Sequence, residues 1–450
     1  MFDFDTIVIG GGSAGMSAAK EAAAQGARVA LVERDRLGGA ALWRREVPSR
    51  ALARSARAWE LVKRGEEFGV HVEKPKLVWN AVRLRLADVR DEIRRLQRDE
   101  LNQAGVEIIQ GHARFADAGT LEIETKNGTR TATGRQFIVA AGSRPEAVGI
   151  PGLFAAGFVF PAQVFERPSL PKSLVVLGSD AIGLEMAQTF ARFGTRVVLI
   201  CEAKSLVSEA APEIGELLAR VLRGEGVEIH LGATVTGVEA SEGRKRVTFE
   251  IAGSAHSAEA GEIVAAMGET PCLNDLGLER AGVESNPSGV PYGVFVNETM
   301  QTNVAHIFAC GSCVYSPQSS RNEGRRAGLA ASGAPLSPQS APDVRIIATD
   351  PEIALINPDP EEARLRDAAF VTRRADFKAL PGAHIEGETS GLAVLFLGAG
   401  NLVSGAQIIG PRAGEIAGLA MGSLAAISDD VSFDPLSFGD VLTRVVPAQE

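Results

Sequence analysis

The sequence is poor in the features that mark secreted, membrane and nucleic-acid-binding proteins. Four cysteines in a chain of 450 residues are too few for a disulfide framework. No run of about 18 apolar residues provides a membrane span. The formal net charge is −10, and the sequence has no cluster of Lys and Arg. Both features argue against a nucleic-acid partner. Because no basic or amphipathic leader precedes the first apolar run, MFDFDTIVIG, we expect a cytoplasmic protein.

A metal site is also missing from the pattern. The six histidines are scattered, and no group of Cys and His has the spacing of metal ligands. Glycine, in contrast, is abundant, with 49 residues, and several of the glycines recur at equivalent positions. At this length the chain suits two or three domains, each with its own apolar core.

One internal repeat is evident. IVIGGGSAGMSAAKEAAAQGARVALVE, near the start, is echoed by LVVLGSDAIGLEMAQTFARFGTRVVLICE, which begins at Leu174. Each copy has a short apolar strand, a glycine turn, an Ala-rich amphipathic helix and a second apolar strand. The repeat therefore predicts an α/β fold with two Rossmann-like dinucleotide-binding domains.

Other elements follow from periodicity. Apolar spacing of three and four predicts a helical stretch over 49–103, and alternating strands are joined by an Asn127-Gly128 turn. The segment 332–344, rich in Pro, Ser and Ala, indicates a linker. Beyond it, VRIIATDPEIALI, AVLFLGAG and LVSGAQIIGP alternate as strands, and PRAGEIAGLAMGSLAAI predicts an apolar helix.

The first copy of the repeat carries a dinucleotide fingerprint. Gly10, Gly12 and Gly15 fill the G-x-G-x-x-G template between a strand and a helix, and Glu33 ends the next strand 18 residues after Gly15. The glycines permit a tight turn, close approach of a diphosphate and close helix packing. The helix N-terminus favours the phosphates, and Glu33 can accept from ribose hydroxyls. A plain glycine-rich turn is the alternative.

Several further motifs resemble those of one family. They are LGGAALWRREVPSRAL, VAAGSRP, IGLE, AAMGETP, MQTNVAHIFACGS, TDPEIA and GAQIIGPRAGE, spread over nearly the whole chain. Together with the two fingerprints they resemble the class I pyridine nucleotide-disulfide oxidoreductases, which include dihydrolipoamide dehydrogenase, mercuric reductase and glutathione reductase.

The resemblance implies a homodimer with a specific domain plan. An FAD-binding domain over 1–148 and 262–331 would be split by an NAD(P)-binding-like domain over 149–261, followed by an α+β dimerisation domain over 345–450. It also implies further FAD-binding positions, in addition to the fingerprint glycines and Glu33. These are Gly38, Gly39, Ala113, Gly142, Gly311 and Ser312. Ser312 replaces the family's aspartate, which holds the ribityl chain, and can still make one hydrogen bond.

The segment of the family's redox dithiol departs from the pattern. The two cysteine positions are Ala41 and Glu46, and neither residue can form the thiolate that disulfide exchange requires. Arg50 stands where the family has a lysine paired with the glutamate of IGLE, which is Glu185 here. The resemblance therefore suggests Arg50 and Glu185 as a catalytic pair, with a solvated surface pair as the alternative.

The C-terminus departs as well. The family places a His-Glu dyad there as acid-base catalyst, whereas this chain has Val446 before Pro447, and its last histidine is His384. No such dyad can form. The redox cysteine pair and the His-Glu dyad act in the same reaction in that family, and both are missing here. Their loss indicates that disulfide reduction has been abandoned.

The second fingerprint is altered at its centre. Gly178 and Gly183 keep the outer glycines, but the middle position is Asp180. A carboxylate about 4 Å from a phosphate costs on the order of 4 kcal/mol at an effective dielectric near 20. Outward rotation of Asp180 could restore binding, and a helix N-cap is the structural alternative. The remaining NAD(P) positions that the resemblance suggests are Glu202, one residue after Cys201, and Gly268.

A CxxC spacing remains at Cys310 and Cys313, at the start of an expected helix. It is either a relocated redox dithiol or a pair of small apolar residues in a tight corner.

Two functions are consistent with these observations. The first is an FAD-dependent oxidoreductase that passes electrons, with NAD(P)H as a potential small-molecule donor, to a quinone, oxygen or a metal ion. The second is a non-catalytic flavoprotein homologue that acts as a subunit or ligand sensor.

Overall fold

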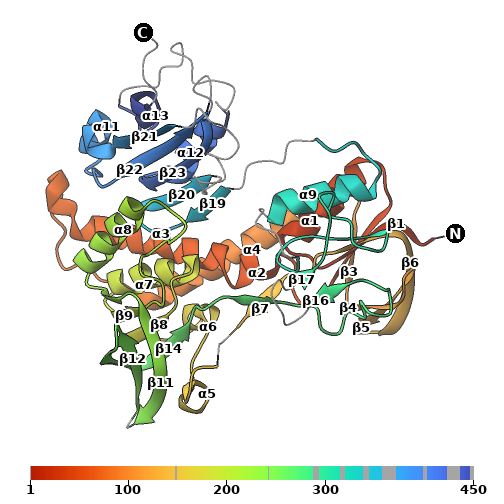
Figure 1. Ribbon diagram of the computed structural model, residues 1–450, viewed down its shortest axis with the longest axis horizontal. Helices are drawn as coiled ribbons and strands as arrows, with labels where there is room; N and C mark the ends of the chain where they lie inside the picture. Colours follow the sequence, from red (N-terminus) through yellow and green to blue (C-terminus); the bar gives the residue numbers. More distant parts are fainter. Residues whose placement is uncertain are drawn as a thin grey trace. The chain divides into compact units, whose positions relative to one another are not determined.

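The chain forms two compact units, each described by itself (Figure 1). The first comprises 1–48, 83–146 and 268–341, and the second comprises 49–82, 147–267 and 342–450. The computed structural model describes residues 2–146, 149–241, 243–286, 293–314, 320–337, 344–356, 371–398, 403–422 and 436–445.

The first unit is built on a seven-stranded sheet in the order β3-β2-β1-β6-β5-β4, with β18 on the free side of β6. Five strands are parallel, and β4, β5 and β6 form an antiparallel extension. The strands are β1 (Phe4–Ile9), β2 (Val29–Glu33), β3 (Glu107–Gln110), β4 (His112–Asp117), β5 (Thr120–Thr125), β6 (Gly128–Val139) and β18 (Ile307–Ala309). The predicted turn at Asn127-Gly128 is confirmed, because it joins β5 to β6.

Alternation along β1 explains why apolar layers form on both faces of this sheet. Ile7 and Ile9 belong to one buried cluster and Val8 to another, as the period of two in a strand requires. Helices α1 (Ser13–Ala24) and α9 (Ser320–Ala331) cover the Val8 face and lie side by side (Figure 1). They approach closely because a Cβ on Gly324 would stand 2.1 Å from the carbonyl oxygen of Ala14.

The second unit contains the second copy of the repeat. Its parallel sheet has the order β10-β9-β8-β14, and a three-stranded antiparallel sheet, β11-β12-β13, accompanies it. The strands are β8 (Ser173–Leu177), β9 (Arg196–Ile200), β10 (Glu228–His230), β11 (Ala233–Ser241), β12 (Arg244–Ile251), β13 (Ser254–Ala260) and β14 (Glu262–Ala265), with helices α5 (Leu153–Ala156), α6 (Pro161–Phe165), α7 (Ala181–Arg192) and α8 (Pro212–Gly224). Strand β14 begins at residue 262, where the second part of the FAD-binding domain was predicted to start, and it pairs with β8 in parallel register.

The C-terminal part of the second unit is an antiparallel sheet in the order β19-β20-β23-β22-β21. Its elements are β19 (Val344–Ile347), β20 (Glu352–Ile356), β21 (Val371–Asp376), η2 (Phe377–Ala379), α11 (Pro381–Ile385), β22 (Leu392–Leu397), β23 (Val403–Gly410), α12 (Ala413–Gly422) and α13 (Asp440–Val445). These elements agree with the strands expected after the linker and with the apolar helix as far as Gly422; residues 423–427 of that helix lie outside the described residues. Residues 338–343 of that linker, and Val446 with Pro447, lie outside the described residues.

The predicted helical stretch over 49–103 is two helices rather than one. Helix α3 (Glu46–Lys63) ends before a short 3-10 turn, η1 (Gly65–Phe68), and α4 (Trp79–Gln103) follows. Gly69 has a φ of 72°, which terminates the first helical segment in the left-handed region. In the described part of the chain, no helix is long and apolar enough to cross a membrane.

A buried ion cluster ties several elements of the second unit together. The Arg192 guanidinium on α7 binds Glu225 through Nε and Nη2, at 2.9 and 2.7 Å, and Asp350 through Nη1, at 2.7 Å. Gln188 donates to the carbonyl of Asp350 at 2.6 Å and accepts from its N–H at 2.7 Å. Helix α7 is therefore fixed to the turn between β19 and β20.

Candidate functional site

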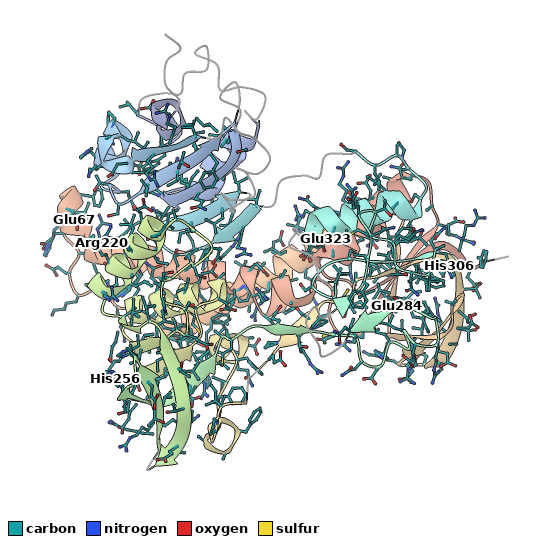
Figure 2. The ribbon with its side chains drawn as sticks, viewed as in Figure 1. Glu67, Arg220, His256, Glu284, His306 and Glu323 are labelled. Carbon is teal, nitrogen blue, oxygen red and sulfur yellow. The ribbon has the colours of Figure 1, made fainter. Side chains whose placement is uncertain are left out.

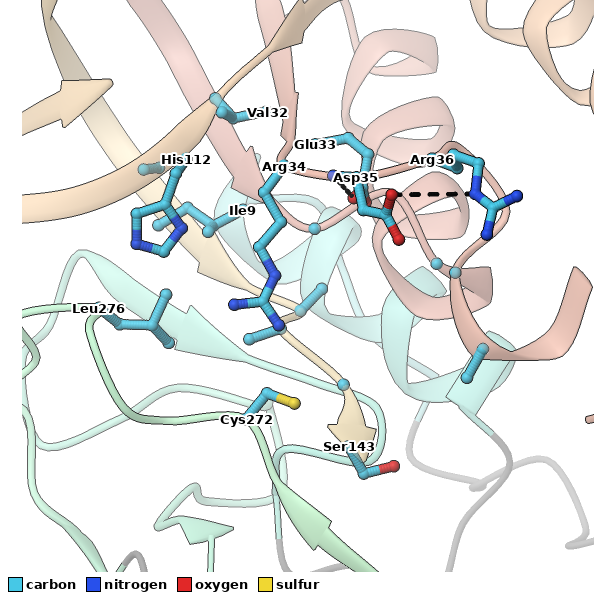
Figure 3. Close-up of a pocket in the computed structure, with 18 of the residues that line it drawn as sticks. Ile9, Val32, Glu33, Arg34, Asp35, Arg36, His112, Ser143, Cys272 and Leu276 are labelled. Carbon is cyan, nitrogen blue, oxygen red and sulfur yellow. Dashed lines mark hydrogen bonds and ion pairs between the residues drawn. The ribbon is translucent and has the colours of Figure 1, made fainter. Parts of the chain in front are cut away.

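A pocket of about 170 Å³ opens in the first unit at the carboxyl ends of β1, β2 and β6 (Figure 3). This is the edge of a parallel sheet where ligands bind in doubly wound folds. The walls contain many of the residues predicted to bind FAD, namely Gly10, Gly12, Glu33, Gly39, Ala113 and Gly142.

The glycines of the fingerprint are required by close backbone contacts. Gly10 has a φ of +108°, and a Cβ there would stand 2.2 Å from the carbonyl oxygen of Ala140. A Cβ on Gly15 would stand 1.9 Å from the carbonyl oxygen of Gly10, and one on Gly39 would stand 2.8 Å from the Cα of Gly12. The bare backbone thus forms a cradle that side chains would fill, which fits the diphosphate of FAD.

The N-terminus of α1 supplies hydrogen-bond donors to this cradle. Gly12 is the N-cap, and no side chain caps the helix there. The first N–H groups of a helix have no partner within the helix, and the dipole adds partial positive charge at the same place. This end of α1 is therefore suited to an anion.

Glu33 is oriented by the backbone. Its carboxylate is 8% exposed, and it accepts from the N–H of Gly11 through Oε2 and from the N–H of Asp35 through Oε1, both at 2.7 Å. Each carboxylate oxygen can accept a second bond. Glu33 is thus held in place and can still accept from a ribose hydroxyl.

The other predicted FAD residues lie outside the pocket walls. Gly38 adopts a φ of +104° and donates to the carbonyl of Gly11 at 2.8 Å. Gly311 donates its N–H to the buried carboxylate of Glu323, labelled in Figure 2, at 2.6 Å. Ser312 is exposed and is not among the residues that line the pocket.

The CxxC pair is buried. Cys310 and Cys313 have no exposed surface, and Cys313 Sγ donates to the carbonyl of Val139 at 3.4 Å. Burial raises the pKa of Cys313 to about 11 and the pKa of Cys310 well above its ordinary value. Thiols of this kind are poor nucleophiles, so the structure favours the packing interpretation over a relocated dithiol.

No ion pair joins Arg50 to Glu185 among the described residues, and their catalytic role stays a prediction. Arg50 is exposed, whereas Glu185 is 3% exposed. The Glu185 carboxylate instead accepts from the Ser49 hydroxyl and, at 2.7 Å, from the N–H of Ala348. Glu185 therefore links α7 to α3 and to the turn after β19.

In the second fingerprint, the side chain of the middle residue, Asp180, binds the N-terminus of the helix. Asp180 is the N-cap of α7, and its Oδ1 accepts from the N–H of Gly183 at 2.8 Å. The carboxylate thus takes a donor that a diphosphate would otherwise use, which favours the N-cap interpretation. Gly178 keeps a φ of +101°.

The other expected NAD(P) positions add little to this site. Cys201 is buried at the strand end, and burial raises its pKa to about 11, while Glu202 is exposed. Gly268 belongs to the first unit, unlike the rest of the set.

Comparison with known proteins agrees with this geometry. The family model described as pyridine nucleotide-disulphide oxidoreductase matches residues 4–331. A mercuric reductase from Bacillus cereus is 30% identical over 421 residues, which cover 92% of this chain and 66% of that protein. A dihydrolipoyl dehydrogenase from Geobacillus stearothermophilus is 29% identical over 417 residues, covering 92% of this chain and 88% of that protein.

A solved structure shows the same fold. The Cu(II) complex of the HOCl-induced flavoprotein disulfide reductase RclA from Escherichia coli superposes with a TM-score of 0.84 at 21% sequence identity, covering 99% of each chain. Proteins of the matched family bind FAD and use NAD(P)H as a substrate. The fingerprint, the pocket and these likenesses together show that the chain belongs to the pyridine nucleotide-disulphide oxidoreductase family of FAD-dependent flavoproteins.

Proposed function

We propose that this protein is an FAD-dependent oxidoreductase that works without a redox-active disulfide and passes electrons to a non-disulfide acceptor. A quinone, oxygen or a metal ion would serve as acceptor, and NAD(P)H is a candidate donor. FAD, when bound, supplies both hydride and one-electron transfer, so a thiol relay is not needed. The chain's own contribution is to bind and orient the cofactor.

The observation that carries this proposal is the chemistry of the α2–α3 segment. Ala41 lies in α2 (Gly39–Trp43), and Glu46 is the first residue of α3. Glu46 stands 3.5 Å from Arg45 as an ion pair, which is no substitute for a thiolate. The buried, high-pKa thiols of Cys310 and Cys313 do not offer an alternative dithiol.

A competition between acceptors tests the proposal. The purified holoprotein is mixed with NADH or NADPH under anaerobic conditions, and then with a short-chain quinone, ferricyanide or a small disulfide. We expect flavin reduction, then reoxidation by the first two acceptors only. Sustained turnover of the disulfide would contradict the absence of a thiol route, and an unbleached flavin at millimolar nucleotide would remove NAD(P)H as donor.

A second candidate function is favoured by the N-cap at Asp180. If the closed second fingerprint prevents nucleotide binding, the protein would be a flavoprotein homologue that serves as a subunit or ligand sensor. Co-purification with a partner enzyme would support this function. Steady multiple turnovers with any acceptor would exclude it.

We also propose a homodimer formed through the C-terminal part of the second unit. Large apolar side chains are exposed there, with Ile385 at 65%, Leu436 at 58% and Leu419 at 45%. Burial of these side chains against a second copy of the chain would remove their apolar surface from water. Light scattering on the eluted holoprotein should give twice the chain mass of 47.2 kDa, and the mass of a single chain would contradict this assignment.

A further inference from the structure

The pocket of the first unit contains two arginines without a carboxylate partner. Arg34 and Arg44 line its walls, and neither guanidinium forms an ion pair with any residue that the structure describes. Arg36, in contrast, stands 3.8 Å from Asp35. Figure 3 shows the Arg34 side chain reaching into the pocket toward Cys272. Glu33 and Asp35 line the same pocket, but Glu33 accepts from two backbone N–H groups and Asp35 faces Arg36. Arg34 and Arg44 are therefore available to bind an anionic ligand.

A series of contacts fixes Arg44 at the pocket wall. Its Nη2 donates to the carbonyl oxygen of Ser143 at 3.2 Å, and Ser143 is 5% exposed. The Ser143 hydroxyl donates to Glu269 Oε2 at 2.5 Å, and Arg45 Nη1 lies 2.5 Å from the same oxygen. Glu269 therefore binds Arg45, which follows Arg44 in the chain, and also Ser143, whose carbonyl oxygen accepts from Arg44.

The backbone supports the same arrangement. Ser143 lies in β7 (Ser143–Pro145), and Glu269 lies in β15 (Glu269–Pro271), which pairs with β7 in antiparallel register. The Glu269 side chain thus connects the two-stranded ribbon to Arg45, the residue directly before α3. Because Glu269 fixes both Arg45 and the ribbon strand that contains Ser143, Arg44 has limited freedom to leave the pocket wall.

We propose that Arg44 binds the diphosphate of the adenine dinucleotide in this pocket and that Glu269 is its positioning residue. The inference rests on the proposed FAD function and deepens it. A guanidinium presents a planar fork that matches phosphate oxygens, and the uncapped amides of α1 face the same pocket at Gly12. The segment between Ala41 and Glu46, where related enzymes place a dithiol, here supplies a phosphate-binding cation.

Ligands of graded charge test the role of Arg44. FAD, ADP and adenosine are titrated by calorimetry against the flavin-free wild type and Arg44→Met, with Arg280→Met as a matched control. Arg280 is an exposed arginine of the same unit that does not line the pocket. We expect Arg44→Met to weaken FAD and ADP at least about fivefold, the factor equivalent to 1 kcal/mol of attraction in water, and to leave adenosine unchanged.

Salt dependence gives a readout that a structural defect would not produce. The difference between wild type and Arg44→Met should shrink at about 1 M NaCl, where the Debye length is about 3 Å. Arg44→Lys should recover part of the ADP affinity, because it keeps the charge and loses the fork. Equal losses for ADP and adenosine, or a loss that is independent of salt, would overturn the assignment.

A double-mutant cycle tests Glu269. Glu269→Gln keeps the shape of the side chain and removes the charge that holds Arg45. We expect it to weaken ADP binding in the wild-type background and to have no further effect in Arg44→Met, because it acts through Arg44. Additive losses would overturn the positioning role. If the wild type binds neither FAD nor ADP, the proposed function itself fails. If the wild type and Arg44→Met bind both ligands equally well, only the assignment of Arg44 fails.

Discussion

Replacing Asp180 by glycine would open the second fingerprint if its carboxylate is what closes it. The substitution removes the acceptor that now takes the N–H of Gly183 at 2.8 Å, and it restores the G-x-G-x-x-G pattern. Glycine is itself tolerated at an N-cap, so the lost cap should cost only a few tenths of a kcal/mol of stability. The fold should therefore survive the change, and nucleotide affinity can be measured on an intact protein.

The size of the gain follows from the charge and its surroundings. Two unit charges about 4 Å apart interact by roughly 1 kcal/mol in water and roughly 4 kcal/mol at an effective dielectric of 20. Asp180 is half-buried, so its effect should lie between these limits. We expect NADH or NADPH to bind between about fivefold and several hundredfold more tightly to Asp180→Gly than to the wild type.

Calorimetric titration of the wild type, Asp180→Gly and Asp180→Asn measures this gain. Asparagine can keep the N-cap bond and the bulk of the side chain while removing the charge, so it separates repulsion from steric exclusion. A gain shared by both variants assigns the effect to charge, and a gain in Asp180→Gly alone assigns it to bulk. Unchanged affinity in both variants, with FAD still bound, would refute the reasoning.

Three further substitutions should have measurable effects. Gly15→Val should yield protein without flavin absorbance, because even a Cβ there meets a carbonyl oxygen at 1.9 Å. Arg192→Met should lower the free energy of unfolding by about 3 kcal/mol in denaturant titrations, because it removes the cation that Glu225 and Asp350 share, although Asp350 keeps Arg57 at 3.7 Å. Burial raises the pKa of Glu388 above its ordinary value of 4.5, so its ionisation opposes folding as pH rises through the folded pKa. The Tm of Glu388→Gln should therefore exceed that of the wild type at pH 8, with a smaller difference at pH 5; a constant difference would contradict this sign.

Local rules made the core of the fold predictable. Positions such as Gly10 and Gly15 are readable from the sequence because only glycine avoids the contacts found at 2.2 and 1.9 Å. Alternation and helical periodicity likewise placed the strands and helices, because each depends on near neighbours in the chain. The break after α3 was missed because the stretch was assigned from apolar spacing alone, although Gly69 and Pro75 lie in the break and disfavour a continuous helix.

Choices between distant partners were less predictable. Ser49 and Arg50 are adjacent, and successive residues on a helix point about 100° apart. The phase of α3 therefore decides which of them meets Glu185, and the structure selects Ser49. The link from Glu269 to Arg45 and Ser143 was also missed, because it depends on the pairing of β7 with β15 across more than a hundred residues of chain.

The two copies of the repeat differ in what satisfies the N-terminus of the first helix. Gly12 leaves the first amides of α1 to an external anion, whereas Asp180 provides α7 with an anion of its own. A tethered carboxylate competes at an effective concentration in the millimolar range or above, so a free diphosphate must displace it before it can bind. The first copy gains hydrogen bonds only when its ligand arrives, whereas the second is already satisfied. Because a ligand that binds only the folded state stabilises it by RT ln(1 + [L]/Kd), FAD should raise the Tm of the first unit more than the same concentration of any nicotinamide nucleotide raises that of the second. Calorimetric scans with each ligand would resolve the two, and an equal rise with NADH would mean that the Asp180 cap yields readily to a diphosphate.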